Sequence, residues 1–88
     1  MKMMNERIYK VETRINGESA PSLYTSNPYQ AQEEFLAMVS IDVDSVYITD
    51  ANTGEIYAYY NCSRGEWGVE IDRGVSREFT EVLAGLRV

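Results

Sequence analysis

The sequence contains no histidine. This absence removes imidazole general bases, Ser–His and Cys–His nucleophile pairs, and the commonest protein ligand of transition metals. The glycines are scattered, and no Gly-Lys-Ser or Gly-Lys-Thr sequence follows a predicted strand, as a phosphate-binding loop would require. We therefore predict a protein that is not an enzyme and that uses neither a cofactor nor a metal ion.

Features of secreted and membrane proteins are also scarce. Cys62 is the only cysteine, so no internal disulfide can form, as is typical of a reducing compartment. Arg64 lies two residues further on and could lower the pKa of this thiol, but a plain turn cysteine is the better interpretation because no base accompanies it. No apolar run approaches the ~18 residues of a membrane span, and the first residues, MKMMNERIYK, lack an apolar signal core. These features predict a cytoplasmic protein that does not enter a membrane.

Positive charge is missing from the middle of the chain. Between Arg14 and Arg64 there is no Lys or Arg, and the net charge of the whole chain is −6. The carboxylates of this segment are Glu18, Glu33, Glu34, Asp42, Asp44, Asp50 and Glu55. Such a surface repels phosphate backbones, which bind Lys and Arg, so direct nucleic-acid binding is disfavoured and a basic protein surface is the expected partner.

The 88 residues form one domain, 1–88, in which residues 1–6 are expected to fray. Residues 7–15 alternate as a half-buried strand does, and Asn16-Gly17 is a favoured two-residue hairpin turn. A weaker strand follows over 18–25, and Pro21 places it at a sheet edge. Asn27 then caps a helix predicted over 28–40.

The second half of the chain predicts three more strands and a helix. The strands cover 45–50, 55–61 and 66–72, and the helix covers 76–87 with Phe79, Val82, Leu83 and Leu86 on its buried face. The order β-β-α-β-β-β-α predicts an α+β fold. It is a two-layer domain with an antiparallel sheet of four to five strands and both helices on one face.

The turn between the strands 45–50 and 55–61 resembles a calcium loop in Asp50-Ala51-Asn52-Thr53-Gly54. Its glycine comes one position too early, and Asn61 stands where a bidentate glutamate is needed. A hairpin turn without a metal is therefore the better interpretation.

Tyrosines fill the strand pair on both sides of this turn. If Asp50 pairs with Glu55, one face carries Val46, Ile48, Tyr57 and Tyr59, and the other carries Tyr47, Thr49, Ile56, Ala58 and Tyr60. Two short helices can cover one sheet face only, so at least two tyrosines and an isoleucine or valine should stay on the outer face. These tyrosines either stiffen the sheet as cross-strand pairs or form a contact surface. Base stacking is a further possibility that the surrounding carboxylates disfavour.

Three functions remain open from the sequence. The first is a protein-binding module, in particular a small acidic inhibitor that occupies a nucleic-acid site on its partner, as anti-restriction or anti-CRISPR decoys of phages and mobile elements do. The second is a structural or accessory domain that forms a homodimer or larger homo-oligomer and buries the spare sheet face by self-association. The third, a small enzyme or ligand binder, is disfavoured by the missing histidine. The predicted contact residues are Glu33, Glu34, Asp42, Asp44, Asp50, Glu55, Tyr47, Tyr57, Tyr59 and Tyr60.

Overall fold

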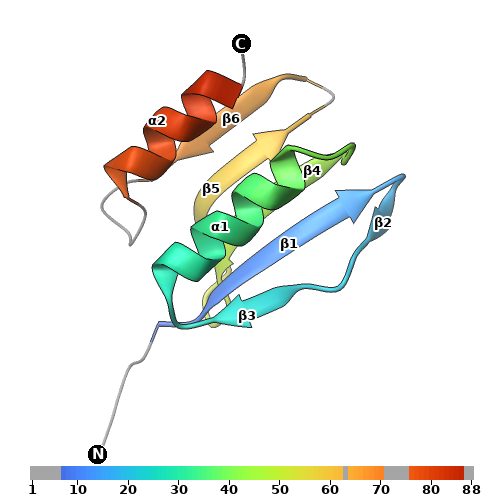
Figure 1. Ribbon diagram of the computed structural model, residues 1–88. Helices are drawn as coiled ribbons and strands as arrows, with labels where there is room; N and C mark the ends of the chain where they lie inside the picture. Colours follow the sequence, from blue (N-terminus) through green and yellow to red (C-terminus); the bar gives the residue numbers. More distant parts are fainter. Residues whose placement is uncertain (1–6, 63, 71–75, 87–88) are drawn as a thin grey trace, which may run out of the picture.

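The computed structural model describes residues 7–62, 64–70 and 76–86 (Figure 1). Its elements are β1 (Tyr9–Ile15), β2 (Glu18–Ser19), β3 (Leu23–Thr25), α1 (Pro28–Val39), β4 (Ser45–Asp50), β5 (Ile56–Asn61), β6 (Glu66–Val69) and α2 (Arg77–Leu86). The predicted α+β class is confirmed. The expected frayed terminus at 1–6, the end of the 66–72 strand and the last residue of the 76–87 helix lie outside the described residues.

All strand pairs of the sheet are antiparallel, and the order across it is β2-β1-β4-β5-β6, with β3 also pairing with β1. β2 and β3 are two pieces of the predicted edge strand, which is interrupted around Pro21 because proline cannot donate to the ladder. Asn16 and Gly17 have φ of 54° and 82°, as a tight hairpin between β1 and β2 requires. The chain order therefore matches the prediction except that the edge strand counts as two.

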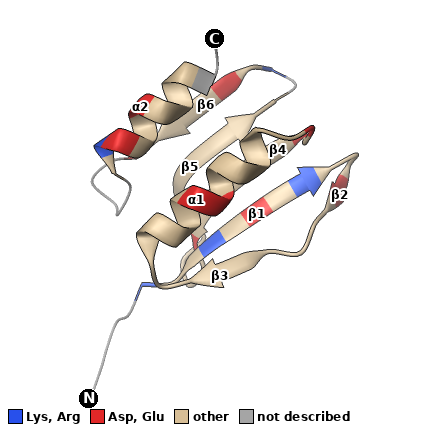
Figure 2. Cartoon of the chain, in the orientation of Figure 1, with Lys and Arg blue, Asp and Glu red and all other residues tan. Residues whose placement is uncertain are grey.

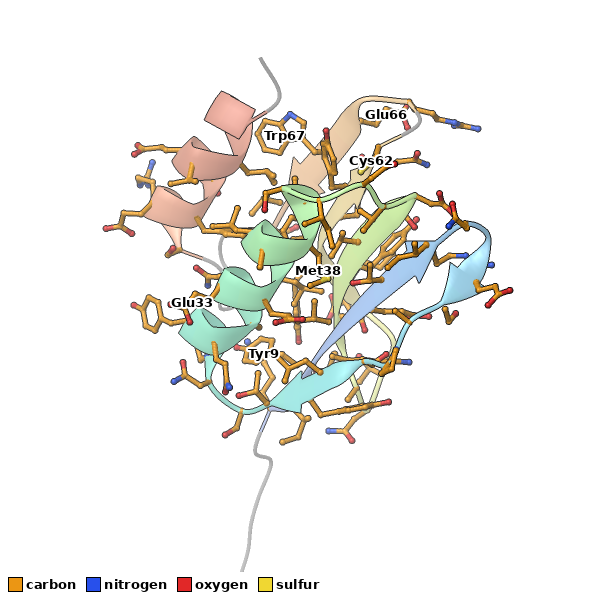
Figure 3. The ribbon with its side chains drawn as sticks, turned by 45° about the vertical axis from the view of Figure 1, so that its right-hand side comes forward. Tyr9, Glu33, Met38, Cys62, Glu66 and Trp67 are labelled. Atoms are coloured by element: carbon orange, nitrogen blue, oxygen red, sulfur yellow. The ribbon has the colours of Figure 1, made fainter. Side chains whose placement is uncertain are left out.

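Both helices lie on the same face of the sheet, which we call the inner face (Figure 1). The rings of Phe35 in α1 and Phe79 in α2 meet edge to face, with centroids 5.2 Å apart. Figure 3 shows Trp67 of β6 beside α2 and Met38 on the sheet side of α1. The buried apolar core consists of Tyr9, Val11, Ala31, Phe35, Val43, Val46, Ile48, Tyr57, Ala58, Phe79 and Leu83. No helix in the described part of the chain is long and apolar enough to cross a membrane.

Each helix begins at a polar cap, and the cap at Asn27 is the predicted one. The Asn27 side chain accepts a hydrogen bond from the backbone N–H of Tyr29 at 2.9 Å, and the Ser76 hydroxyl accepts one from Phe79 N–H at 3.0 Å. Ser76 also donates to the buried side chain of Gln32 at 2.8 Å, which ties the start of α2 to α1. The predicted burial of Val82 is wrong, because its side chain is 50% exposed on the solvent side of α2.

The pairing of β4 with β5 differs from the predicted register by one residue along most of its length. Near the turn Thr49 faces Ile56 as expected, but from Ile48 onward the partner shifts and Ile48 faces Ala58. Tyr57 is the extra residue of this β-bulge, and a bulge lets two successive side chains point to the same side. Tyr57 and Ala58 are accordingly both buried, at 2% and 1% exposure.

Candidate contact surface on the outer sheet face

The sheet face opposite the helices, which we call the outer sheet face, is built by β1, β4, β5 and β6 (Figure 1). Alternation along each strand sends every second side chain to this face. In the middle row Glu12, Tyr47, Tyr59 and Gly68 are successive cross-strand neighbours. The outer sheet face includes Lys10, Glu12, Arg14, Ser45, Tyr47, Thr49, Ile56, Tyr59, Asn61, Glu66, Gly68 and Glu70.

Two stacked tyrosines occupy the centre of the outer sheet face. The rings of Tyr47 and Tyr59 are inclined by 25° with centroids 6.3 Å apart, and both side chains are half-buried. Tyr59 also lies over Gly68, where an added Cβ would come within 2.5 Å of the tyrosine Cε1. Because Gly68 has no side chain, the Tyr59 ring can lie directly on the β6 backbone. Tyr47 and Tyr59 together form one aromatic surface across two strands.

Ile56 extends the aromatic centre toward the turn end of the sheet, and 49% of its surface is exposed. It lines two open hollows of about 340 Å³ each. The first hollow is also bordered by Tyr47 and Arg14, and the second by Tyr59 and Glu70. Both hollows are open to solvent, so the centre is a ridge between two shallow depressions and has no enclosed pocket.

The charges of the outer sheet face are divided between its two sides. β1 contributes Lys10 and Arg14, with Glu12 between them, and the β6 side contributes Glu66 and Glu70 (Figure 2). Lys10 lies 3.7 Å from Glu12, and Glu66 lies 3.9 Å from Arg64 in the turn before β6. Both are partly or largely exposed ion pairs, which hold their geometry weakly. The face is therefore basic at the β1 side, acidic at the β6 side and apolar between them.

The predicted carboxylates occupy three separate places. Glu33 is on α1 and points away from the sheet (Figure 3), whereas Asp42 and Asp44 lie in the loop before β4. Asp50 and Glu55 lie at the other end of β4, a six-residue strand that separates Asp44 from Asp50 by about 20 Å. The structure thus does not bring the acidic residues together beside exposed tyrosines. The residues are close in the sequence, but α1 and β4 place them on the helical side and at the two ends of the sheet.

Two of the predicted contact residues on β5 are turned inward. Tyr60 faces Val46 and packs against the core, and Tyr57 is 2% exposed. The predicted faces of Tyr59, Ala58 and Tyr60 are therefore wrong, and the bulge at Tyr57 is the cause. The expectation that at least two tyrosines and an isoleucine or valine stay on the uncovered face is confirmed. The outer sheet face carries Tyr47, Tyr59 and Ile56.

Tyr57 instead anchors the turn end of the inner face. Its hydroxyl donates to Asp50 at 2.8 Å, its ring meets Tyr9 edge to face at 5.5 Å, and the Arg7 guanidinium lies 5.6 Å above the ring. Burial, followed by the bond to Asp50, raises the pKa of Tyr57 to about 12. The bond from Tyr57 and that from the Asn52 N–H lower the pKa of Asp50. These carboxylate bonds hold the turn, so Asp50 has a structural role here.

The chemistry available to other side chains is limited. Burial and the nearby carboxylates of Asp42 and Asp44 raise the pKa of the Cys62 thiol, which is the opposite of the effect considered for Arg64. Asp44 itself accepts a hydrogen bond from the Gly17 N–H at 2.7 Å and so fastens the β1–β2 turn. Across the described residues, no group of three or more acidic or cysteine side chains lies close enough to hold a metal ion.

Several residues of the outer sheet face were not among the predicted contact residues. Lys10, Arg14, Glu66 and Glu70 occupy alternate positions in the predicted strands 7–15 and 66–72, and this alternation indicates which of them share a face. The missing information was the order of the strands, which sets the β1 and β6 side chains at opposite sides of β4 and β5.

Comparison with known proteins identifies no relative for this arrangement. The chain matches no protein-family model, and no curated protein or solved structure is significantly similar to it. The proposed function is therefore argued from the surface itself.

Proposed function

We propose that this protein is a non-enzymatic protein-binding module and that the outer sheet face is its contact surface. The observation that carries the proposal is an apolar, tyrosine-centred sheet face that neither helix covers. Tyrosine contributes a large contact area at low entropic cost and carries a polar tip, and it is enriched at protein interfaces. Charged residues frame this centre, as they frame the rim of ordinary protein interfaces.

The same geometry disfavours the other classes of ligand. The two hollows beside Ile56 are open, whereas small-molecule sites enclose most of their ligand. Lys10 and Arg14 are outnumbered by the carboxylates of the same face, and the chain carries a net charge of −6, so a phosphate backbone would be repelled.

A second candidate uses the helical side of the molecule. Exposed carboxylates on α1 and α2 include Glu33, Glu78 and Glu81, and Arg77 is the only basic residue within the two helices (Figure 2). An acidic helical layer favours the decoy hypothesis, in which the module occupies the basic surface of a nucleic-acid-binding protein. On this hypothesis replacing Glu33 and Glu34 with lysine weakens partner capture, most strongly at low ionic strength.

A pair of matched positions separates the two candidates. Ile56 is 49% exposed on the outer sheet face and Val82 is 50% exposed on α2. Each is replaced in turn by the photo-reactive residue p-benzoylphenylalanine, and the protein is irradiated in lysate of the organism that encodes it. We expect covalent protein adducts from position 56 and none from position 82. Adducts from position 82 alone would favour the helical layer, and adducts from neither position would refute the binding module.

A further inference from the structure

We propose that the partner of the outer sheet face is a second copy of this chain. The two copies pack face to face about a two-fold axis that runs parallel to the strands, between β4 and β5. This inference rests on the proposed function, because it names the occupant of the same surface. It follows from the way charge and apolar area are distributed across the strand order.

The charges make this face complementary to itself. An axis between β4 and β5 exchanges the two sides of the sheet, so β1 of one copy lies over β6 of its partner. Lys10 and Arg14 on β1 then face the side that carries Glu66 and Glu70. The positions along the strands also match, because a rotation about this axis leaves them unchanged. Arg14 and Glu66 are at one end of the face, and Lys10 and Glu70 are at the other end.

An axis at right angles to the strands lacks this complementarity. It places β1 over β1 with the two ends exchanged, so that Lys10 of one copy meets Arg14 of the other. Like charges directly opposite each other cost free energy, and Glu66 would meet Glu70 in the same way. The charge pattern therefore selects the axis that runs along the strands.

The apolar centre of the face is also complementary to itself under this two-fold rotation. Tyr47 on β4 and Tyr59 on β5 exchange places about the axis, so each ring lies against the other residue of the pair in the partner copy. The hollow bordered by Arg14 and the hollow bordered by Glu70 come together and leave room for these long side chains. The ion pairs that Lys10 and Glu66 form within one chain are partly or largely exposed and can be exchanged at little cost.

The dimensions of the face fit another sheet. The four strand positions from β1 to β6, at about 4.8 Å each, span about 19 Å, and a six-residue strand spans about 20 Å, so two facing sheets would bury on the order of 800 Å² in total. A single peptide strand or helix would leave much of this flat area exposed. An interface of this size is smaller than that of tight complexes, so we expect a weak dimer that dissociates at concentrations on the order of 100 µM.

The net charge of the molecule does not oppose this dimer at close range. Two copies, each carrying −6, repel each other overall. The exposed carboxylates of α1 and α2, such as Glu33 and Glu81, lie on the far side of each copy (Figure 2). The outer sheet face carries charges of both signs, which makes it a favourable side for two such chains to meet.

Charge reversal tests the inference by equilibrium sedimentation of the full chain at about 10–500 µM. Wild-type protein should approach twice the monomer mass across this range. A β1 variant, Lys10→Glu with Arg14→Glu, and a β6 variant, Glu66→Lys with Glu70→Lys, should each associate at least tenfold more weakly. Mixed in equal amounts, the two variants should form a heterodimer, because both of its junctions then pair opposite charges. At one junction the new β1 carboxylates face the new β6 lysines, and at the other the native Lys10 and Arg14 face the native Glu66 and Glu70. A control variant on α2, Glu78→Lys with Glu81→Lys, changes the net charge as the β6 variant does and should dimerise at least as well as the wild type.

The outcomes separate this inference from the proposed function. Wild-type protein that stays monomeric up to the highest concentration overturns the self-association, while adducts of other proteins at position 56 would still support a binding module. A wild-type dimer without a heterodimer of the charge variants overturns the axis. A measurement that needs no variant is the change of amide ¹H–¹⁵N shifts with dilution, which should concentrate at Tyr47, Thr49 and Tyr59. Shifts concentrated on α1 or α2 instead would also overturn the inference.

Discussion

The inner and outer faces of the same sheet use aromatic residues in different ways. On the inner face the rings of Phe35, Phe79 and Tyr57 are buried and meet their neighbours edge to face. On the outer sheet face Tyr47 and Tyr59 are stacked nearly parallel and remain partly exposed. Edge-to-face rings fill a three-dimensional core, whereas parallel rings make a flat surface that another flat surface can cover. The inner face thus stabilises the fold, and the outer sheet face is available for contact.

Removing one ring from each face should give the largest contrast. Phe35 is 0% exposed, so Phe35→Ala should lower the free energy of unfolding by about 3–5 kcal/mol through lost burial and the cavity it leaves. Tyr47→Ala removes a partly exposed ring from a cross-strand pair and should cost about 1 kcal/mol. Urea unfolding followed by circular dichroism measures both values.

The contrast would be lost if the two substitutions cost the same. Equal losses would mean that Tyr47 is as important to the fold as the core, and that the outer sheet face is not a spare surface. Since a domain of this size has a stability of only about 5–10 kcal/mol, the Phe35→Ala protein should also unfold at much lower urea concentration.

Glycine substitutions sharpen the comparison because their effects should differ in sign. An alanine at Gly68 would place its Cβ within 2.5 Å of Tyr59 Cε1, so the ring must swing off β6 and lose its stack with Tyr47. We expect Gly68→Ala to destabilise the protein by about 1 kcal/mol. Gly85 in α2 has no atom within 4 Å of an added Cβ, so Gly85→Ala should stabilise the helix by roughly 0.5–1 kcal/mol. Thermal and urea unfolding of the two variants compare the signs.

A double substitution isolates the contact between ring and glycine. In a Tyr59→Thr background the ring is gone, so Gly68→Ala should no longer destabilise the strand. If Gly68→Ala costs as much without the ring as with it, the backbone of β6 and not Tyr59 requires the glycine.

The sequence predicts the local structure well where one face of a strand is apolar and the other polar. In β1 the alternation correctly assigns Val11 and Thr13 inward and Glu12 outward. The turn residues Asn16-Gly17 and Gly54 also have the positive φ that their identity predicts. Each of these predictions depends on chemistry within a few residues, which the sequence displays directly.

The bulge in β5 could not be predicted in the same way. Ile56, Tyr57, Ala58, Tyr59 and Tyr60 are apolar or aromatic on both parities, so a shift of one residue exposes no obviously worse set of side chains. The bond from Tyr57 to Asp50 and the packing of that ring on Tyr9 favour the shifted register. Both are tertiary contacts that alternation does not encode.

The expected acidic patch failed for a related reason. Glu33, Asp44 and Asp50 all belong to the segment without cations, but they lie on α1, in the loop before β4 and at the end of β4. The cations of the neighbouring segments, Lys10 and Arg14, lie instead beside Tyr47 on the outer sheet face. Counting charge by segment cannot predict such a surface, because strand order in the sheet decides which segments are neighbours.

Titration of Tyr57, the buried tyrosine at the bulge, tests the inner face through the pH dependence of stability. Its pKa in the folded protein is about 12 against an ordinary value near 10, so the folded state keeps a proton that the unfolded state loses between these values. The free energy of unfolding should therefore fall as the pH rises from about 10 to about 12. Tyr57→Phe keeps the ring on Tyr9 but has no proton to lose, so its stability should decline less over this range. Urea unfolding of both proteins at several pH values measures the difference, and parallel declines would show that the Tyr57 hydroxyl titrates as freely as it does in the unfolded chain.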